Sequence, residues 1–135
     1  MHSWHDRVTA FYNKNGYVET LTGRRRRGPL NNNQVINTPI QGTAADLTTD
    51  AMNRISLLAE ERELPWLQPR LQIHDDLTFW VPRKKVDDCI EIVSKEMVRS
   101  TFDFVNVPTI VEMEVGKDWY HMESVGSFKG EPARV

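Results

Sequence analysis

The chain has 135 residues, of which 39% are hydrophobic and 27% charged, with a formal net charge of −2. These values are typical of one globular domain or part of one, and they exclude a disordered chain. No apolar run approaches the roughly 18 residues of a membrane-spanning helix, and no signal segment begins the chain. The single cysteine, Cys89, can form neither an internal disulfide nor a zinc cluster, so we expect a reducing, cytoplasmic setting.

The charges are unevenly distributed along the chain. Residues 1–35 contain six Lys/Arg and two Asp/Glu, which leaves residues 36–135 with a net charge of −6. Four of the basic residues are consecutive, from Arg24 to Arg27. A basic first quarter followed by an acidic body predicts a local anion-binding face rather than a generally basic protein.

Two short elements are predicted before the arginine run. Residues 3–15 carry apolar side chains at helical spacing, and Asn15-Gly16 supplies a stop, so we predict a helix there. Residues 17–21 alternate as a strand does. Residues 24–33, rich in arginine and asparagine and interrupted by glycine and proline, are expected to form a loop.

The clearest helix signal begins at Thr38. This residue can act as the N-cap, Pro39 fits the first turn, and Gln41 completes a Thr-x-x-Gln capping box. Gly42 lies in the first turn of this predicted helix, where a glycine costs about 1 kcal/mol of helix stability. Its presence at an unfavourable position indicates the close approach of another backbone or of a ligand. One apolar stripe follows over about five turns, formed by Ile40, Ala44, Leu47, Ala51, Ile55 and Leu58.

The second half of the chain predicts a hairpin, a helix and a strand. Leu71–Ile73 and Leu77–Val81 are apolar runs that flank His74-Asp75-Asp76, as in a β-hairpin with acids at its tip. Residues 86–97 have the spacing of an amphipathic helix, and residues 111–115 alternate as a half-buried strand does. The order of these elements predicts an α+β fold with antiparallel pairing.

Asp75 and Asp76 are the strongest candidates for chemistry. Two adjacent carboxylates repel each other by about 1 kcal/mol in water, and more where solvent is restricted. A bound divalent cation would relieve this repulsion, and Mg²⁺ prefers carboxylate oxygens. The alternative is a polar hairpin turn with no ligand. His74 could donate a hydrogen bond to a phosphate or a nucleic-acid end, or could be a packed residue at a strand end.

The arginine run and Gln41 also allow two interpretations. Arginines make planar, bidentate contacts with phosphates, and the amides of Asn31–Asn33 add neutral hydrogen-bonding groups beside them. The alternative for Arg24–Arg27 is a solvated loop. For Gln41, the predicted capping box is by itself a sufficient explanation.

Four motifs carry a resemblance to a known family: Gly16–Leu21, Gly23–Arg26, Asn37–Leu47 and Gln72–Asp76. In this order they closely resemble the C-terminal palm segment of family-A DNA polymerases, a group that includes bacterial DNA polymerase I and phage replicative enzymes. The resemblance covers roughly residues 7–120.

For the fold, the resemblance implies an antiparallel palm-type sheet in which a β-hairpin carries the acids and amphipathic helices pack on the strands. Residues 1–128 would form this partial palm domain, with Val115–Trp119 as its last strand and the start of a tail. Residues 129–135 would be a flexible tail. The short loop after the arginines and the tail are more similar to those of a phage enzyme.

For catalysis, the resemblance implies that His74, Asp75 and Asp76 lie at the reaction site. Asp75 matches the palm carboxylate that, with a second carboxylate from an upstream strand, holds two Mg²⁺ ions at the primer 3′ end. Asp76 stands where glutamate is usual and is one methylene shorter, so we extend the metal-ligand role to Asp75 alone. His74 matches a histidine near the primer terminus.

For DNA binding, the resemblance implies minor-groove contacts and backbone contacts. Gln41 and Asn37 match residues that read the minor groove beside the active site, where acceptors on all base pairs permit a sequence-independent check. Asn33 stands where many relatives have a DNA-contacting arginine, and that role is not extended to it. The candidate DNA-binding residues are Gln41, Asn37, Arg24, Arg25, Arg26 and Gln72.

The family's upstream aspartate strand and its nucleotide-binding fingers helix have no match in this sequence. The resemblance therefore implies a DNA-directed DNA polymerase, a nucleotidyltransferase, that is inactive without an upstream fragment carrying the remaining palm, fingers and thumb. Its expected partners are primer–template DNA, a dNTP held by the complete enzyme, and that fragment, in the cytoplasm of a bacterial or phage-infected cell.

Two alternatives from other classes are left open. The first is a non-catalytic DNA-binding or assembly module that retains the palm fold. The second is a metal-dependent phosphohydrolase that uses a His-Asp pair. For this class the remaining histidines, His2, His5 and His121, lack the required spacing.

Overall fold

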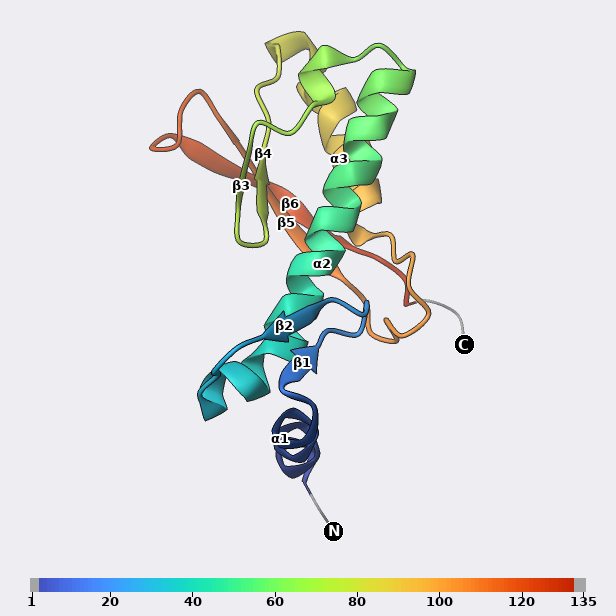
Figure 1. Cartoon of the computed structure of the whole chain (residues 1–135). Helices are drawn as coiled ribbons and strands as arrows, with labels where there is room; N and C mark the ends of the chain where they lie inside the picture. The colour runs from blue at the N-terminus through green and yellow to red at the C-terminus, as the bar shows by residue number, and fades with distance from the viewer. Residues whose placement is uncertain (1–2, 133–135) are drawn as a thin grey trace. The chain divides into compact units, whose positions relative to one another are not determined.

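The computed structural model describes residues 3–132, and Figure 1 labels the helices and strands. The chain divides into two compact units, Met1–Leu47 and Thr48–Val135. In chain order the helices and strands are α1 (Trp4–Asn15), β1 (Tyr17–Glu19), β2 (Arg25–Arg27), α2 (Asn32–Glu61), β3 (Leu71–Ile73), β4 (Asp76–Thr78), α3 (Val86–Val98), β5 (Ile110–Gly116) and β6 (Met122–Lys129), with short 3₁₀ turns at Pro65–Leu67 and Arg83–Lys85.

The predicted first helix is confirmed as α1. The Ser3 hydroxyl accepts a hydrogen bond from the Asp6 N–H at 3.2 Å, and the Ser3 N–H donates to the Asp6 carboxylate at 2.9 Å. This reciprocal pair is a capping box. At the other end Gly16 adopts φ of 73° and donates its N–H to the Tyr12 carbonyl at 2.7 Å. Both ends of α1 are therefore set by residues that are local in sequence.

The arginine run is not entirely a loop, contrary to the prediction. Arg25–Arg27 form β2, which pairs antiparallel with β1 in a register that places Arg27 opposite Tyr17 and Arg25 opposite Glu19. Such cross-strand ion pairs and aromatic contacts stabilise a sheet, and they explain why these arginines extend. The predicted strand over 17–21 is shortened to β1.

The predicted capping box at Thr38 and Gln41 is wrong, because α2 begins earlier. Asn31 and Gln34 form the reciprocal cap instead, with the Gln34 N–H donating to Asn31 Oδ1 at 2.9 Å and the Asn31 N–H donating to Gln34 Oε1 at 3.1 Å. Thr38 lies inside the helix, as does Pro39. The asparagine run thus contains a second cap signal that begins the helix at Asn32.

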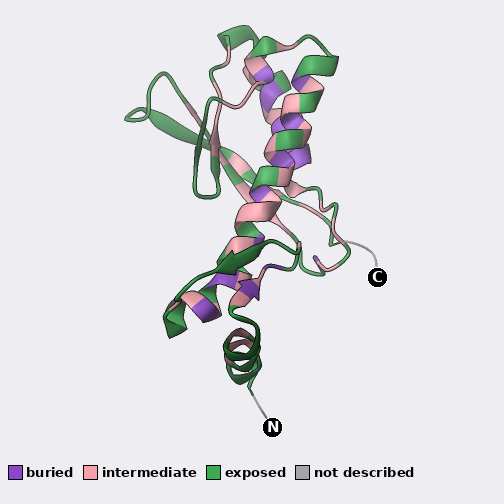
Figure 2. Ribbon diagram, viewed as in Figure 1, coloured by how far each residue is buried: buried purple, intermediate pink, exposed green. Residues whose placement is uncertain are grey.

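In the second unit, α2 and α3 pack together through a common core. Figure 2 colours the buried residues of both helices purple. Arg54 of α2 ties the two helices together, donating to the Glu96 carboxylate at 3.2 Å and to the Glu96 carbonyl at 2.8 Å. Leu77, Phe79 and Met113 pack against the core from the hairpin and β5. The buried residues of this core are Ile55, Ala59, Leu67, Cys89 and Val93.

The strands of residues 3–132 form three separate two-stranded antiparallel sheets: β1 with β2, β3 with β4, and β5 with β6. The predicted α+β class is confirmed. The predicted acidic hairpin is also confirmed, although β4 ends at Thr78 rather than at Val81. The prediction of a strand over 111–115 is confirmed, since β5 alternates between exposed and half-buried residues.

Sequence reasoning missed β6. Its sequence lacks the alternation of β5. Lys129, which falls in the expected tail, is the last residue of the strand and pairs with Ile110. Residues 133–135 of the predicted tail lie outside the described residues. Among the helices of the described part, none is long and apolar enough to cross a membrane.

Candidate nucleic-acid interface and acidic hairpin

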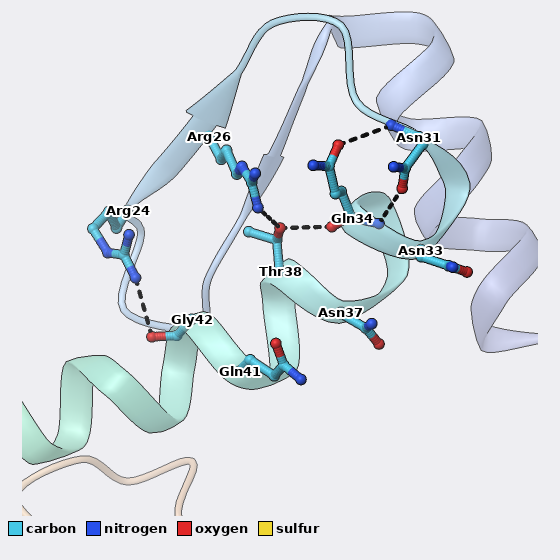
Figure 3. Close-up of a pocket in the computed structure, with 9 residues that line it drawn as sticks. All are labelled: Arg24, Arg26, Asn31, Asn33, Gln34, Asn37, Thr38, Gln41 and Gly42. Atoms are coloured by element: carbon cyan, nitrogen blue, oxygen red, sulfur yellow. Dashed lines mark hydrogen bonds between the residues drawn. The ribbon is translucent and has the colours of Figure 1, made fainter. Parts of the chain in front are cut away.

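A polar pocket of about 490 Å³ lies in the first unit (Figure 3). Its lining contains arginines, amides, a hydroxyl and a glycine, and none of its residues is acidic. It brings together four of the six predicted DNA-binding residues, whereas Arg25 and Gln72 are not part of it. The lining residues are Arg24, Arg26, Asn31, Asn33, Gln34, Asn37, Thr38, Gln41 and Gly42.

Strand geometry separates the arginines of β2 into two groups. Arg26 extends toward α2, where its guanidinium donates to the Thr38 hydroxyl at 3.1 Å. Because successive side chains of a strand point to opposite faces, Arg25 and Arg27 lie on the other face. There they approach the Tyr17 ring at 4.6 and 5.7 Å from its centroid.

Arg25 is held by a partner on that second face. Its Nε donates to the Glu19 carboxylate at 2.8 Å, and this hydrogen bond raises the pKa of the Arg25 guanidinium further above its ordinary value. The predicted contact of Arg25 with DNA would therefore have to arise away from the pocket.

Arg24 is engaged with α2. Its Nε donates to Asp46 Oδ1 at 2.7 Å, and its Nη2 donates to the Gly42 carbonyl at 3.2 Å. Burial by itself raises the pKa of the Asp46 carboxyl, but hydrogen bonds from Thr22, Thr20 and Arg24 outweigh burial and hold this pKa below its ordinary value. Sequence reasoning assigned no role to Asp46, although it lies one helical turn after Gly42 in the same motif.

A close approach at Gly42 is found, but the neighbours are side chains rather than the backbone or ligand that the sequence predicted. A Cβ added to Gly42 would lie 2.7 Å from Thr20 Cγ2 and 3.3 Å from Arg24 Nη2. The first distance is shorter than van der Waals contact allows. Gly42 is therefore required because the turn after β1 packs directly on the helix.

Asn37 and Gln41 are exposed and lie one turn apart on α2. Among the residues that the structure describes, neither side-chain amide has a hydrogen-bond partner, and Figure 3 shows both without one. Asn33 lies one turn before Asn37, so the three amides form a row along one side of the helix. Each free amide offers both a donor and an acceptor to a ligand.

The acidic hairpin lies in the second unit. Ile73 pairs with Asp76, so His74 and Asp75 form a two-residue turn, and Asp76 begins β4. His74 adopts φ of 55°, the left-handed region that costs a residue with a side chain about 1 kcal/mol or more. The Gln72 amide donates to the His74 carbonyl at 3.3 Å, which places Gln72 within the hairpin.

The two acids of the hairpin fit part of a magnesium site. Asp75 and Asp76 are both exposed, and within residues 3–132 neither carboxylate has a hydrogen-bond or ion-pair partner. Their free oxygens are the donors that Mg²⁺ prefers. The described residues contain no group of three or more His, Cys, Asp or Glu that could hold a metal ion. Further ligands would have to come from elsewhere to complete an octahedral set.

Comparisons with known proteins identify the family. Residues 1–121 match DNA polymerase family A. The chain is 34% identical over 127 residues to DNA polymerase I of Chloroflexus aurantiacus, with 87% of this chain and 13% of that protein covered. It is 35% identical over 133 residues to the thermostable DNA polymerase I of Thermus filiformis, with 87% and 15% covered. The chain thus spans 13–15% of the length of these relatives.

A solved structure supports the same relationship. It is the POL domain of Pol1 from M. smegmatis in complex with DNA primer-template and dNTP. The two share 28% sequence identity with a TM-score of 0.61, and the match covers 70% of this chain and 18% of the other. Since the family match extends over most of the sequence and both units, this chain belongs to DNA polymerase family A.

Proposed function

We propose that this chain supplies the C-terminal palm portion of a DNA-directed DNA polymerase. In this proposal it contributes a metal-binding aspartate and contacts to the primer terminus and the minor groove for template-directed nucleotidyl transfer. The observation that carries the proposal is the pocket of the first unit, where Arg26, Asn37 and Gln41 lie together with no acidic residue in the lining. Membership of family A supports it.

The pocket would hold the primer–template duplex. The Arg26 guanidinium suits a phosphate, because it can donate to two oxygens at once. The free amides of Asn37 and Gln41 suit the minor groove, where every base pair offers acceptor atoms at similar positions. Contacts of this kind detect correct pairing without reading sequence. The neutral and basic lining favours a polyanion.

The hairpin would serve the reaction itself. Asp75 would be a metal ligand at the turn, with an exposed carboxylate that no other described residue engages. Mg²⁺ bound there would lower the pKa of the primer 3′-hydroxyl and stabilise the charge that develops at the transferred phosphate. Asp76 begins β4 and has a shorter side chain than glutamate, so it would support Asp75 from beside it. His74 would donate a hydrogen bond to the primer terminus.

The complete activity would require a second polymerase segment. The relatives are several times longer than this chain, and the second metal-binding carboxylate, fingers and thumb would come from that segment together with the site for the dNTP. The isolated chain would not polymerise DNA, and the assembled enzyme would act in the cytoplasm. Exposed apolar side chains in the second unit support such an assembly, among them Leu57, Ile73, Trp80 and Ile110.

The test of the pocket is duplex binding by the double variant Asn37→Ala/Gln41→Ala. We expect about tenfold weaker binding of a primer–template duplex, measured by fluorescence anisotropy at low salt. The dependence of affinity on salt should be unchanged, because no charge is removed. Asn53→Ala is the matched control, since Asn53 is an exposed amide on the same helix outside the pocket.

Wild-type affinity of the double variant would show that the duplex does not occupy the pocket. A loss of affinity in Asn53→Ala of the same size would also contradict the proposal, because it would attribute the effect to the helix rather than to the pocket. Thermal unfolding of the variants should match that of the wild type. The cap of α2 is formed by Asn31 and Gln34 and is not disturbed by either substitution.

A further inference from the structure

The segment of α2 that carries Asn37 and Gln41 is weakly held by its own backbone. Pro39 has no N–H, so the helical hydrogen bond to the carbonyl of residue 35 cannot form. The hydroxyls of Thr38 and Thr43 donate to the carbonyls of Gln34 and Pro39 in the preceding turn, an arrangement that tends to bend helices. The position of this segment therefore depends on contacts from outside the helix.

Besides the hydrogen bond from Arg26 of β2 to Thr38, these contacts come from the turn between β1 and β2. Arg24 spans one helical turn of α2, bonding the Gly42 carbonyl with Nη2 and the Asp46 carboxylate with Nε. The Leu21 N–H donates to the Thr43 hydroxyl at 3.0 Å. The absence of a side chain at Gly42 allows Thr20 to approach the helix directly. The turn thus contacts α2 immediately after Gln41.

Asp46 accepts hydrogen bonds from two residues of this turn. One of its oxygens accepts from Arg24 Nε, and the other accepts from the Thr22 hydroxyl. The Thr20 hydroxyl lies 2.9 Å from that of Thr22, and it accepts from the Arg24 N–H at 3.1 Å. The Asp46 side chain is only 17% exposed, whereas that of Arg24 is 56% exposed. Asp46 therefore holds the turn against the helix at Thr22 and at Arg24.

We propose that Arg24 and Asp46 form a clamp that sets the position of Gln41 and Asn37, so that Asp46 is a positioning residue for duplex recognition. The inference rests on the proposed function of the pocket. It assigns Arg24 a task different from that of Arg26, since the guanidinium of Arg24 is directed at a carboxylate and a carbonyl of its own chain. Arg26, the other arginine of the pocket, has no carboxylate partner among residues 3–132 and remains the candidate for a phosphate contact.

The substitution Asp46→Asn separates two readings by the sign of its effect. If Arg24 contacts phosphate, removal of the neighbouring carboxylate releases a positive charge, and duplex binding should tighten with a steeper dependence on salt. If Arg24 and Asp46 act as a clamp, binding should weaken about tenfold with the same salt dependence. We expect the second result from anisotropy titrations of the full chain at several salt concentrations.

A double-variant comparison shows whether the effect passes through the amides. In the Asn37→Ala/Gln41→Ala background, Asp46→Asn should cause no further loss of duplex affinity, because the groups that it positions are gone. An equal loss in both backgrounds would overturn the inference, as it would indicate general destabilisation. The matched control is Asp50→Asn, one turn later on α2, where the carboxylate pairs with Arg54 and Thr101 instead.

Amide hydrogen exchange tests the clamp without DNA. Asp46→Asn should speed exchange about tenfold at residues 37–43, and Asp50→Asn should not. Unchanged exchange in Asp46→Asn would overturn the clamp itself. A different result is faster exchange in Asp46→Asn combined with wild-type duplex affinity of Asn37→Ala/Gln41→Ala. It would leave the clamp in place but overturn the proposed interface, and with it the role of the clamp in duplex binding. The two failures are therefore distinguishable.

Discussion

Ile73 and Asp76 are paired directly across the β3–β4 hairpin, so that Asp75 lies in the turn and Asp76 lies in a strand. Residues directly opposite in a sheet share a face, which places the Asp76 carboxylate beside the exposed side chain of Ile73. The two adjacent acids thus occupy different structural positions. We expect them to differ in their effects when neutralised.

Asp75→Asn should abolish most of the chemistry and leave the fold intact. Asparagine suits a hairpin turn as well as aspartate does, and the repulsion between the two acids is removed. In primer extension by the chain combined with the remainder of a family-A polymerase, turnover should fall by a factor on the order of 10³. Thermal unfolding of the variant should occur at the wild-type temperature or above it.

Asp76→Asn is the comparison for this experiment. It removes the same charge one residue away, and we expect a distinctly smaller loss of turnover. Near-normal extension by Asp75→Asn at saturating Mg²⁺ would show that the aspartate is not a metal ligand. The chain would then be a scaffold or a DNA-binding module.

His74→Gly should stabilise the hairpin while it impairs function. His74 has positive φ, which glycine adopts without steric cost. The substitution removes this backbone strain but adds conformational entropy to the unfolded chain, and the net gain in the free energy of unfolding should be roughly 0.5 kcal/mol. Primer extension should nevertheless slow, because the imidazole donor is lost. Circular dichroism melts and extension assays on the same preparation measure the two effects. A lower melting temperature would indicate that the ring packs against the fold.

Arg26→Gln should flatten the slope of log affinity against log salt by about one. Arg26 lies in the pocket, and among residues 3–132 its guanidinium bonds only to a neutral hydroxyl, so its charge is available to a phosphate. Arg25→Gln removes the same charge from the opposite face, where Glu19 already neutralises it, and should change the slope much less. Equal changes in the two variants, measured by anisotropy, would place the duplex outside the pocket.

Cys89 should make stability depend on pH in the alkaline range. Burial raises the pKa of its thiol from 9.0 to about 11. Below 9.0 the thiol is protonated in both the folded and the unfolded chain, so stability is unaffected. Between 9.0 and 11 the unfolded chain loses this proton more readily, and the free energy of unfolding should fall by about 2 kcal/mol in total. Urea unfolding across this range measures the fall.

Cys89→Ala is the control for the pH experiment. Its stability is expected to be lower than that of the wild type below pH 9.0, because a buried group is removed. The difference between the two proteins should narrow as the pH rises, since only the wild type carries the thiol. A constant difference would show that the thiolate is tolerated in the core.

The elements with local signals were predictable from the sequence. Ser3 and Gly16 mark the two ends of α1, and the apolar spacing that includes Cys89 and Val93 marks α3. The hairpin at His74 and Asp75 is marked by apolar runs on either side of a polar turn. Capping bonds, helical periodicity and turns connect residues only a few positions apart, so their energetics are contained in short stretches of sequence.

Where two local signals competed, the sequence could not decide between them. Both Asn31-x-x-Gln34 and Thr38-x-x-Gln41 have the pattern of a capping box, and the structure uses the first. Thr38 is then free to accept a hydrogen bond from Arg26, across the unit formed by β1, β2 and the start of α2. This contact between segments accompanies the first cap, and a local pattern does not contain it.

Pairing between distant segments was decided only by the tertiary structure. β2 forms by pairing with β1, in a register that places Arg25 opposite Glu19. β6 forms by pairing with the edge of β5. Likewise the motif residues Arg24 and Asp46 were both present in the sequence, but their direct contact was not evident from it. Which side chains meet depends on the packing of whole elements, and packing is a property of surfaces that no short stretch of sequence defines.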